Sequence, residues 1–147
     1  MADGTRTELW AGWSLVLPEG TVAQRNPDKS WSAWDEMHVI DASIIETSGR
    51  QDGSALSPEE MISSAPGERV ELDGAIAVIS TDLEETDTSD GPQQIEWTRV
   101  NAGATNTALV MSIGNRGPRD GAWHEAVWRS IAHTEKKGGL RGLFGGR

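Results

Sequence analysis

The chain contains no cysteine, no tyrosine and a single phenylalanine among its 147 residues. The missing cysteines exclude disulfides, thiolate metal sites and cysteine nucleophiles. No apolar run approaches the roughly 20 residues that are needed to cross a bilayer. The first eight residues also lack the apolar segment that is typical of a signal peptide. We therefore expect a soluble, cytoplasmic protein that does not bind membranes.

Basic residues are scarce except at the C-terminal end. Residues 1–128 hold 8 basic and 22 acidic residues, a net charge of −14, whereas residues 129–147 hold 5 basic residues and 1 acidic residue, a net charge of +4. A body of this charge repels phosphate groups, so nucleic acid is not expected as a partner. The basic segment is rich in glycine and should not form a helix.

Tryptophan is the aromatic residue that this sequence does use. Each indole ring buries roughly 150–250 Å² and brings one N–H group that needs a partner, so tryptophans mark either the core or an exposed binding face. Two of the pairs are three residues apart, and on a strand this spacing puts the two rings on opposite faces. The seven tryptophans are Trp10, Trp13, Trp31, Trp34, Trp97, Trp123 and Trp128.

The hydrophobic pattern alternates between strands and two helices. A capping box at Ser57 and Glu60 begins a helix over residues 57–65, and Asp120 is expected to cap a longer helix over residues 120–133. This order predicts an α+β fold, an antiparallel sheet of about six strands flanked by the two helices. Strands are expected at residues 8–17, 21–26, 30–37, 38–47, 75–81, 94–101 and 105–113.

The same pattern predicts the domain organisation. Residues 1–7 are expected to be a flexible end, residues 8–134 a single domain, and residues 135–147 a disordered tail. Two connections are also expected: an acidic loop over residues 82–91, and a hairpin turn at residues 102–104, where the sequence is Ala-Gly-Ala.

Three short segments resemble the PsbP-like family. They are the opening run from Gly12 to Gly20, which alternates apolar residues and ends in Pro-Glu-Gly, the helix start at residues 57–60, and the closing run from Trp123 to Ile131. Members of this family often have tryptophan directly after Pro-x-Gly, where this chain has Thr21. The family includes the Ran guanine-nucleotide release factor, the photosystem PsbP proteins and bacterial type VI secretion effector chaperones. Over residues 8–134, the resemblance implies an α/β/α sandwich that binds other proteins and has no catalytic residues.

The three histidines offer little for metal or acid–base chemistry. His124 and His133 are nine residues apart, on opposite sides of the expected helix, and cannot share a metal. His38 lies near Asp35, Glu36 and Asp41, where a carboxylate–histidine site is conceivable. A solvated strand edge is the simpler interpretation, and no metal or cofactor is expected.

Two further segments contain side chains that could bind ions. The acids of residues 82–91 lack the alternate spacing, central glycine and closing glutamate of a calcium loop. In residues 114–121, Arg116 and Arg119 precede a helix start and could hold an anion, but Asp120 would oppose it. A solvated loop and a plain strand-to-helix connection are the expected structures.

We therefore expect a non-enzymatic adaptor or secretion-type chaperone that binds a protein partner, and that is a candidate homodimer. Two alternatives stay open: a small-ligand or lipid carrier with a tryptophan-lined cavity, and an enzyme whose site His38 would form with distant acids. Apolar residues of the basic tail could add anchors that order on binding. The residues expected to contact a partner are Trp10, Trp34, Trp128, Leu140, Leu143 and Phe144.

Overall fold

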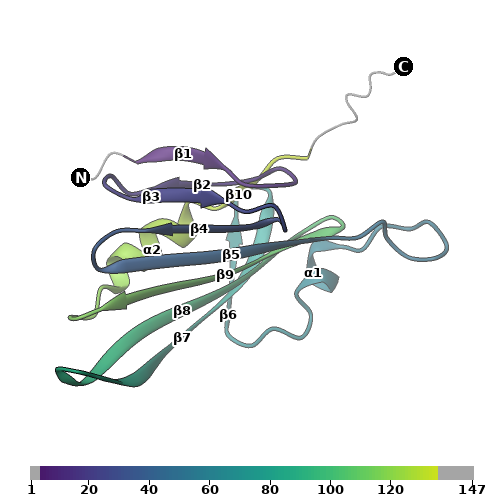
Figure 1. Cartoon of the computed structure of the whole chain (residues 1–147). Helices are drawn as coiled ribbons and strands as arrows, with labels where there is room; N and C mark the ends of the chain where they lie inside the picture. Colours follow the sequence, from purple (N-terminus) through teal and green to yellow (C-terminus); the bar gives the residue numbers. More distant parts are fainter. Residues whose placement is uncertain (1–3, 136–147) are drawn as a thin grey trace.

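The computed structural model describes residues 4–135 as two antiparallel sheets and two short helices (Figure 1). The α+β class is confirmed, but the expected single sheet of about six strands is wrong. One sheet has three strands, in the order β1-β2-β10, and the other has seven, in the order β3-β4-β5-β9-β8-β7-β6. The strands are β1 (Thr5–Glu8), β2 (Trp13–Leu17), β3 (Val22–Arg25), β4 (Ser30–Trp34), β5 (His38–Glu46), β6 (Glu68–Leu72), β7 (Ala75–Thr88), β8 (Gly91–Ala104), β9 (Thr107–Arg116) and β10 (Ala132–His133).

The expected first strand, residues 8–17, is in fact a hairpin. The chain turns at Ala11 and Gly12, which both have positive φ angles, and Trp13 N–H donates to the carbonyl of Trp10. Residues 5–7, which were expected to belong to a flexible end, therefore pair with β2 together with Glu8, as strand β1. The alternation of apolar residues concealed this turn, and Gly12 was its sign in the sequence.

The core lies between the seven-stranded sheet on one side and β2 with helix α2 (Gly121–Arg129) on the other. Alternate residues of β2 point into it, which is the period-2 pattern that the sequence predicts. We call the side of the large sheet that faces this core the core face, and the other side the open face. The largest fully buried apolar side chains of the core are Trp13, Trp31, Leu15, Ile40, Leu109, Met111, Ile113, Ile131, Val100 and Val127.

Helix α1 (Pro58–Met61) packs on one end of the open face. It begins with the expected capping box at Ser57, but it is only one turn long and does not extend to residue 65. A Cβ atom at Gly103 would lie 2.5 Å from the carbonyl oxygen of Pro58, so only glycine lets the helix come this close. The two helices therefore lie on opposite faces of the seven-stranded sheet.

The turn between β8 and β9 lies at Thr105 and Asn106, not at residues 102–104. Asn106 has a φ of 63°, a left-handed conformation that asparagine tolerates better than most residues. The sequence expectation assigned Gly103 to the turn, whereas it is the contact point for α1. This error displaces the register of the two strands.

The acidic segment 82–91 is not a loop. Strands β7 and β8 pair along their whole length, from Ile76 opposite Gly103 to Thr88 opposite Gly91. The distal part forms a two-stranded hairpin that projects beyond the rest of the sheet, at the lower left of Figure 1. Its acids are exposed, and the paired backbone satisfies its own hydrogen bonds.

The last helix ends earlier than the expected residue 133. Helix α2 stops at Arg129, with Ser130 as its C-cap, and Ala132 and His133 then pair with the start of β2 as β10. Asp120 is the N-cap residue, as expected, but its side chain makes no capping hydrogen bond. Its carboxylate is engaged elsewhere, as described below.

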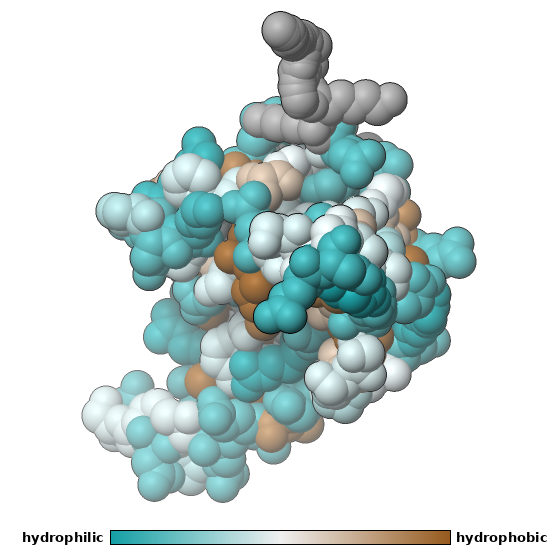
Figure 2. Space-filling model, turned by 90° about the vertical axis from the view of Figure 1, so that its right-hand side faces the viewer, coloured by the Kyte–Doolittle hydropathy of each residue, from teal (hydrophilic) through white to brown (hydrophobic). Residues whose placement is uncertain are grey.

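The surface is largely hydrophilic where Figure 2 shows it, with small apolar areas between polar side chains. Within residues 4–135, no helix has the length and apolar character that a membrane crossing requires.

Candidate binding site

The open face carries a row of apolar residues at the end opposite α1. Trp34, Val39, Gly114 and Trp97 occupy neighbouring strands and lie directly across from one another in the ladder. They surround a hollow of about 310 Å³, which we call the Trp34–Trp97 hollow. Its lining residues are Trp34, Asp35, Glu36, Met37, His38, Val39, Ile95, Trp97, Gly114, Asn115 and Arg116.

Trp97 is held in place by its neighbours. Its ring lies against the backbone of Gly114, where a Cβ atom would stand 2.5 Å from ring carbon Cζ3. The indole N–H donates to the carboxylate of Glu84 over 3.0 Å, and the guanidinium of Arg99 lies 5.3 Å from the ring centre. The ring is therefore fixed before any partner arrives, which lowers the entropic cost of binding.

The other wall of the hollow is more exposed. Trp34 is 39% exposed and Met37 is 43% exposed. Val22, which pairs with Trp34 on edge strand β3, is 55% exposed and extends the apolar row to the edge of the sheet. Exposed tryptophan and methionine side chains are typical of protein interfaces.

Carboxylates surround this apolar row. Asp82 lies directly across from Trp97, and Glu84 lies directly across from Ile95, on the same face of the hairpin. Asp35 and Glu36 line the opposite side of the hollow. Arg116 is the basic residue of the lining, and its guanidinium donates to the carbonyl of Glu36. The hollow therefore presents an apolar floor with a mainly acidic rim.

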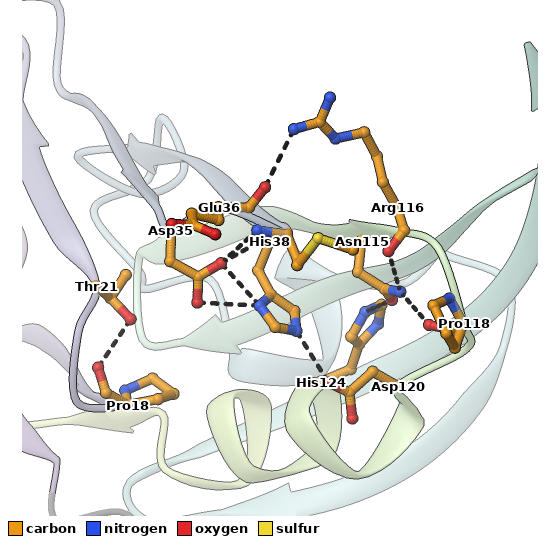
Figure 3. A network of polar contacts seen from close by, with 11 residues as sticks. Pro18, Thr21, Asp35, Glu36, His38, Asn115, Arg116, Pro118, Asp120 and His124 are labelled. Atoms are coloured by element: carbon orange, nitrogen blue, oxygen red, sulfur yellow. Dashed lines mark hydrogen bonds and ion pairs between the residues drawn. The ribbon is translucent and has the colours of Figure 1, made fainter. Parts of the chain in front are cut away.

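His38 is clamped at the base of the hollow by two carboxylates (Figure 3). Its Nδ1 lies 2.9 Å from an oxygen of Asp35, and its Nε2 lies 2.9 Å from Asp120, 82 residues further along the chain. The ring also stacks on Trp123 of α2, with centroids 3.9 Å apart. Both ring nitrogens therefore lie against carboxylate oxygens, which fixes the orientation of the ring.

This arrangement corrects the expectation of a solvated strand edge. The His38 side chain is only 12% exposed and joins β5 to the start of α2. Burial acts to raise the pKa of Asp35, but hydrogen bonds from the N–H groups of Met37 and His38 and from the His38 ring outweigh it and lower the pKa. We infer that the Asp35–His38–Asp120 contacts fix the geometry of this wall of the hollow.

A second histidine is buried directly behind the first. His124 of α2 places Nε2 2.6 Å from Asn115 Oδ1 and Nδ1 2.7 Å from the Thr98 hydroxyl. The Asn115 amide nitrogen donates to the carbonyl of Pro118, so its oxygen must accept from His124 Nε2. Nε2 therefore carries a proton. Burial is the main cause that lowers the pKa of His124, and a neutral ring would accept from the Thr98 hydroxyl at Nδ1.

The start of α2, where an anion site was the less favoured alternative, is already occupied by a side chain. The buried carboxylate of Glu96 accepts from the N–H of Asp120 at 2.8 Å and from the guanidinium of Arg119 at 3.3 Å. An internal carboxylate thus takes the place that a phosphate would need at this helix start. Among residues 4–135, no group of three histidine or acidic side chains is placed to hold a metal ion. His133 lies on β10 and is bonded to the carbonyl of Ala11, apart from His124.

The tryptophan predictions have mixed outcomes. Trp31 and Trp34 do point to opposite faces of β4, with Trp31 buried and Trp34 exposed. Trp128 was expected to be exposed and is instead buried, because it packs into the core from α2. Trp10 is half-buried and packs against the core under the guanidinium of Arg25. The tail residues Leu140, Leu143 and Phe144 lie outside the described residues.

A second hollow, of about 440 Å³, lies beside Trp10 and Trp13, where Thr134 forms part of its lining. The indole nitrogen of Trp10 is buried and has no hydrogen-bond partner within the described part of the chain. The expected odd-spaced pair on one strand does not exist here, since the turn at Gly12 separates Trp10 from Trp13.

Sequence reasoning missed Trp97 and Asp120 as site residues. Trp97 reaches Trp34 only through the β8–β9 register, and the misplaced turn obscured that register. Asp120 reaches His38 because helix α2 begins beside β5, a contact for which the sequence carries no local signal.

No family model matches this chain, and no curated protein matches it. Among solved structures, a similar chain comes from Bacteroides thetaiotaomicron VPI-5482, in a crystal structure at 1.50 Å resolution, with a TM-score of 0.66 and 13% sequence identity. The similarity covers 91% of this chain and 50% of that one, so the present chain spans about half the length of its structural neighbour. At this identity the likeness shows the fold alone.

Proposed function

We propose that this protein is a non-enzymatic protein-binding module whose partner inserts apolar side chains into the Trp34–Trp97 hollow. The observation that supports this most is the continuous apolar row Val22, Trp34, Val39 and Trp97 on a sheet face that α1 leaves uncovered. Soluble domains rarely expose such rows without a partner. A hollow of about 310 Å³ has room for one or two side chains.

The contacts of His38 favour this role over catalysis. Both of its ring nitrogens are held by carboxylates, so the ring would have to give up one contact to accept a proton from a substrate. His124 is likewise held on both sides, by Thr98 and Asn115. These histidines act as structural links in the proposal.

The wider proposal is a cytoplasmic adaptor or secretion-type chaperone of the PsbP-like kind. Helices on opposite faces of an antiparallel sheet are in keeping with an α/β/α sandwich, which the opening and closing segments of the sequence resemble. A protein of this kind binds its partner through an accessible surface and needs no enclosed catalytic centre. The uncovered sheet face would be that surface.

The test is affinity purification from the host cell with Trp34→Ala and Ile45→Ala variants of the full chain. Both residues are exposed on the open face, but Ile45 lies outside the hollow. We expect Trp34→Ala to reduce recovery of the partner at least roughly tenfold, as for an interface anchor, and Ile45→Ala to leave it unchanged. Equal recovery with all three proteins would refute this site.

A small-ligand carrier is the second candidate, because of the hollow beside Trp10. An acceptor on a ligand would satisfy the unpartnered indole N–H of Trp10. Native mass spectrometry of the purified full chain is the direct measurement. A retained mass that is lost in Trp10→Ala would support the carrier, and an unmodified chain mass would speak against it.

A further inference from the structure

We propose that the Trp34–Trp97 hollow receives the segment Leu140–Phe144 from the C-terminal tail of a second copy of this chain. This rests on the proposed function, since it uses the same surface, and it names an occupant for it. The inference combines three observations: the apolar floor of the hollow, the acidic rim, and the position at which the described chain leaves the fold.

The chemistry of the tail matches the floor of the hollow. The sequence of residues 140–144 is Leu-Arg-Gly-Leu-Phe, three apolar side chains within five residues. Leucine and phenylalanine side chains suit a floor made by Trp34, Val39 and Trp97, because aromatic walls pack well against aliphatic and aromatic groups. Elsewhere in the sequence phenylalanine is absent, so this tail holds its one compact aromatic ring.

The charge of the tail matches the rim. Residues 136–147 contain four basic residues and no acid. On the open face, Asp82 and Glu84 lie directly across from Trp97 and Ile95, and Asp35 and Glu36 line the other side. Arg141 stands between the apolar anchors, where a bound tail would bring it to these carboxylates. Complementary charge of this kind speeds association and selects the partner.

The exit point of the chain lies far from the hollow, which favours a tail from another copy. Thr134 N–H donates to the carbonyl of Gly12, next to Trp13, whose indole contacts Thr107 at the start of β9. Gly114, in the hollow, lies seven residues further along β9, a distance of about 23 Å at roughly 3.3 Å per residue.

The hollow lies on the open face of the seven-stranded sheet, whereas Thr134 lies on the side of the core face. A tail that binds the hollow of its own copy would therefore have to pass round an edge of the sheet. Leu140 is six residues beyond Thr134, and six extended residues span at most about 20–22 Å. Leu140 therefore cannot reach the hollow of its own copy, and Phe144, ten residues beyond Thr134, would reach it only with most of the tail extended, since ten residues span at most about 33–36 Å. A tail from a second copy avoids this constraint. Two copies that exchange tails satisfy both hollows in one symmetric dimer.

The experiment measures the self-association of the full chain by sedimentation equilibrium across a concentration series. Three variants are compared with the wild type. Trp34→Ala changes the hollow, the double substitution Leu143→Ser with Phe144→Ser changes the tail, and Ile45→Ala is the matched control on the same face. Circular dichroism establishes that each variant is folded. We expect a wild-type dimer whose dissociation constant rises at least roughly tenfold in the first two variants and is unchanged in the control.

Mixing the first two variants distinguishes exchange between copies from binding within one copy. The Trp34→Ala chain has an intact tail, and the Leu143→Ser/Phe144→Ser chain has an intact hollow. A one-to-one mixture restores one of the two contacts and should dimerise more tightly than either variant alone. Added salt should weaken the dimer, because the acidic rim is exposed.

Three outcomes would each overturn the inference. The wild-type chain could remain monomeric, the tail substitutions could leave the dimer dissociation constant unchanged, or the mixture could dimerise no more tightly than either variant alone. A dimer that Trp10→Ala disrupts while Trp34→Ala does not would also overturn it, since this result would place the tail in the other hollow. If the chain is monomeric and Trp34→Ala still abolishes capture of a different protein, the proposed function holds and this inference fails.

Discussion

The ring of Trp97 lies against the backbone of Gly114, so close that a Cβ atom at residue 114 would stand 2.5 Å from Cζ3. We predict that Gly114→Ala displaces the Trp97 ring and fills the floor of the hollow. Overpacking of this kind costs about 1–3 kcal/mol. Because the Trp97 ring is only half-buried and can shift toward solvent, we expect a cost near the lower value. Capture of the partner should fall with little change in folded content, which near-ultraviolet circular dichroism and affinity purification measure together.

The control for this substitution is Gly121→Ala at the first turn of α2. The nearest atom to a Cβ there is an oxygen of Glu96 at 3.9 Å, an ordinary contact. Alanine in a helix is more stable than glycine by about 0.5–1 kcal/mol, so this variant should be neutral or more stable. Equal loss of binding in both alanine variants would contradict the assigned role of Gly114.

His38 should contribute to stability through the stacking and the hydrogen bonds of its ring. We expect His38→Ala to lower the free energy of unfolding by about 2 kcal/mol, because it removes the stacking on Trp123 and leaves Asp35 and Asp120 without their shared partner. Asp120→Asn keeps a side chain of the same size and should cost under about 1 kcal/mol, since that carboxylate is 42% exposed. Urea unfolding of both variants measures the difference, and the reverse order of the two effects would count against the clamp.

Trp13 should be the most sensitive single position in the core. It is 1% exposed, and its indole N–H donates to the Thr107 hydroxyl at 3.0 Å, which in turn donates to the carbonyl of Ile45. We predict that Trp13→Phe lowers the free energy of unfolding by about 2–4 kcal/mol, through a cavity and a lost hydrogen bond. A double-mutant cycle with Thr107→Val isolates the hydrogen bond, and strictly additive effects would show that the bond contributes nothing.

Acid should destabilise the fold before the carboxylates titrate. Burial lowers the pKa of both His124 and His133 from the ordinary value of 6.5, so the unfolded chain binds protons in a pH range where the folded chain does not. Stability is therefore lost as the pH falls below about 6.5, with a slope of at most roughly 1.4 kcal/mol per pH unit for each histidine. The pKa of Asp35 is lowered from 3.8, so its contribution is lost only at still lower pH.

The measurement is the free energy of unfolding in urea at pH 7.5 and pH 5.5, for the wild type and for His124→Gln. The variant lacks one of the two groups and should show a smaller loss between the two pH values. Parallel losses in the two proteins would mean that His124 is not responsible.

Much of the fold follows from local chemistry in the sequence. The capping box at Ser57, the period-2 pattern of β2 and the opposite faces of Trp31 and Trp34 all depend on neighbouring residues, and the structure has each of them. The sequence predictions were wrong where a residue is required by a contact with a segment far away in the sequence. Gly103 is required by its contact with α1, but the sequence offers a turn as the simpler reason.

The site was harder to predict than the fold, because it depends on register. Trp34 could be named from its spacing to Trp31, whereas Trp97 joins it only through the three ladders that bring β4, β5, β9 and β8 side by side. Asp120 was correctly placed at a helix start, but its contact with His38 spans 82 residues and depends on how α2 crosses the sheet.

The two-residue strand β10 has a consequence for how this chain folds during synthesis. Strand β2 is synthesised early, yet the Val16 N–H donates to the hydroxyl of Ser130, 114 residues later in the chain, and Trp13 pairs with His133. The N-terminal hairpin must therefore wait, with Trp13 and Leu15 uncovered, until almost the whole described chain has left the ribosome. Such late, long-range closure slows folding and exposes apolar strands meanwhile. The fold is complete only once residues 130–133 contact β2.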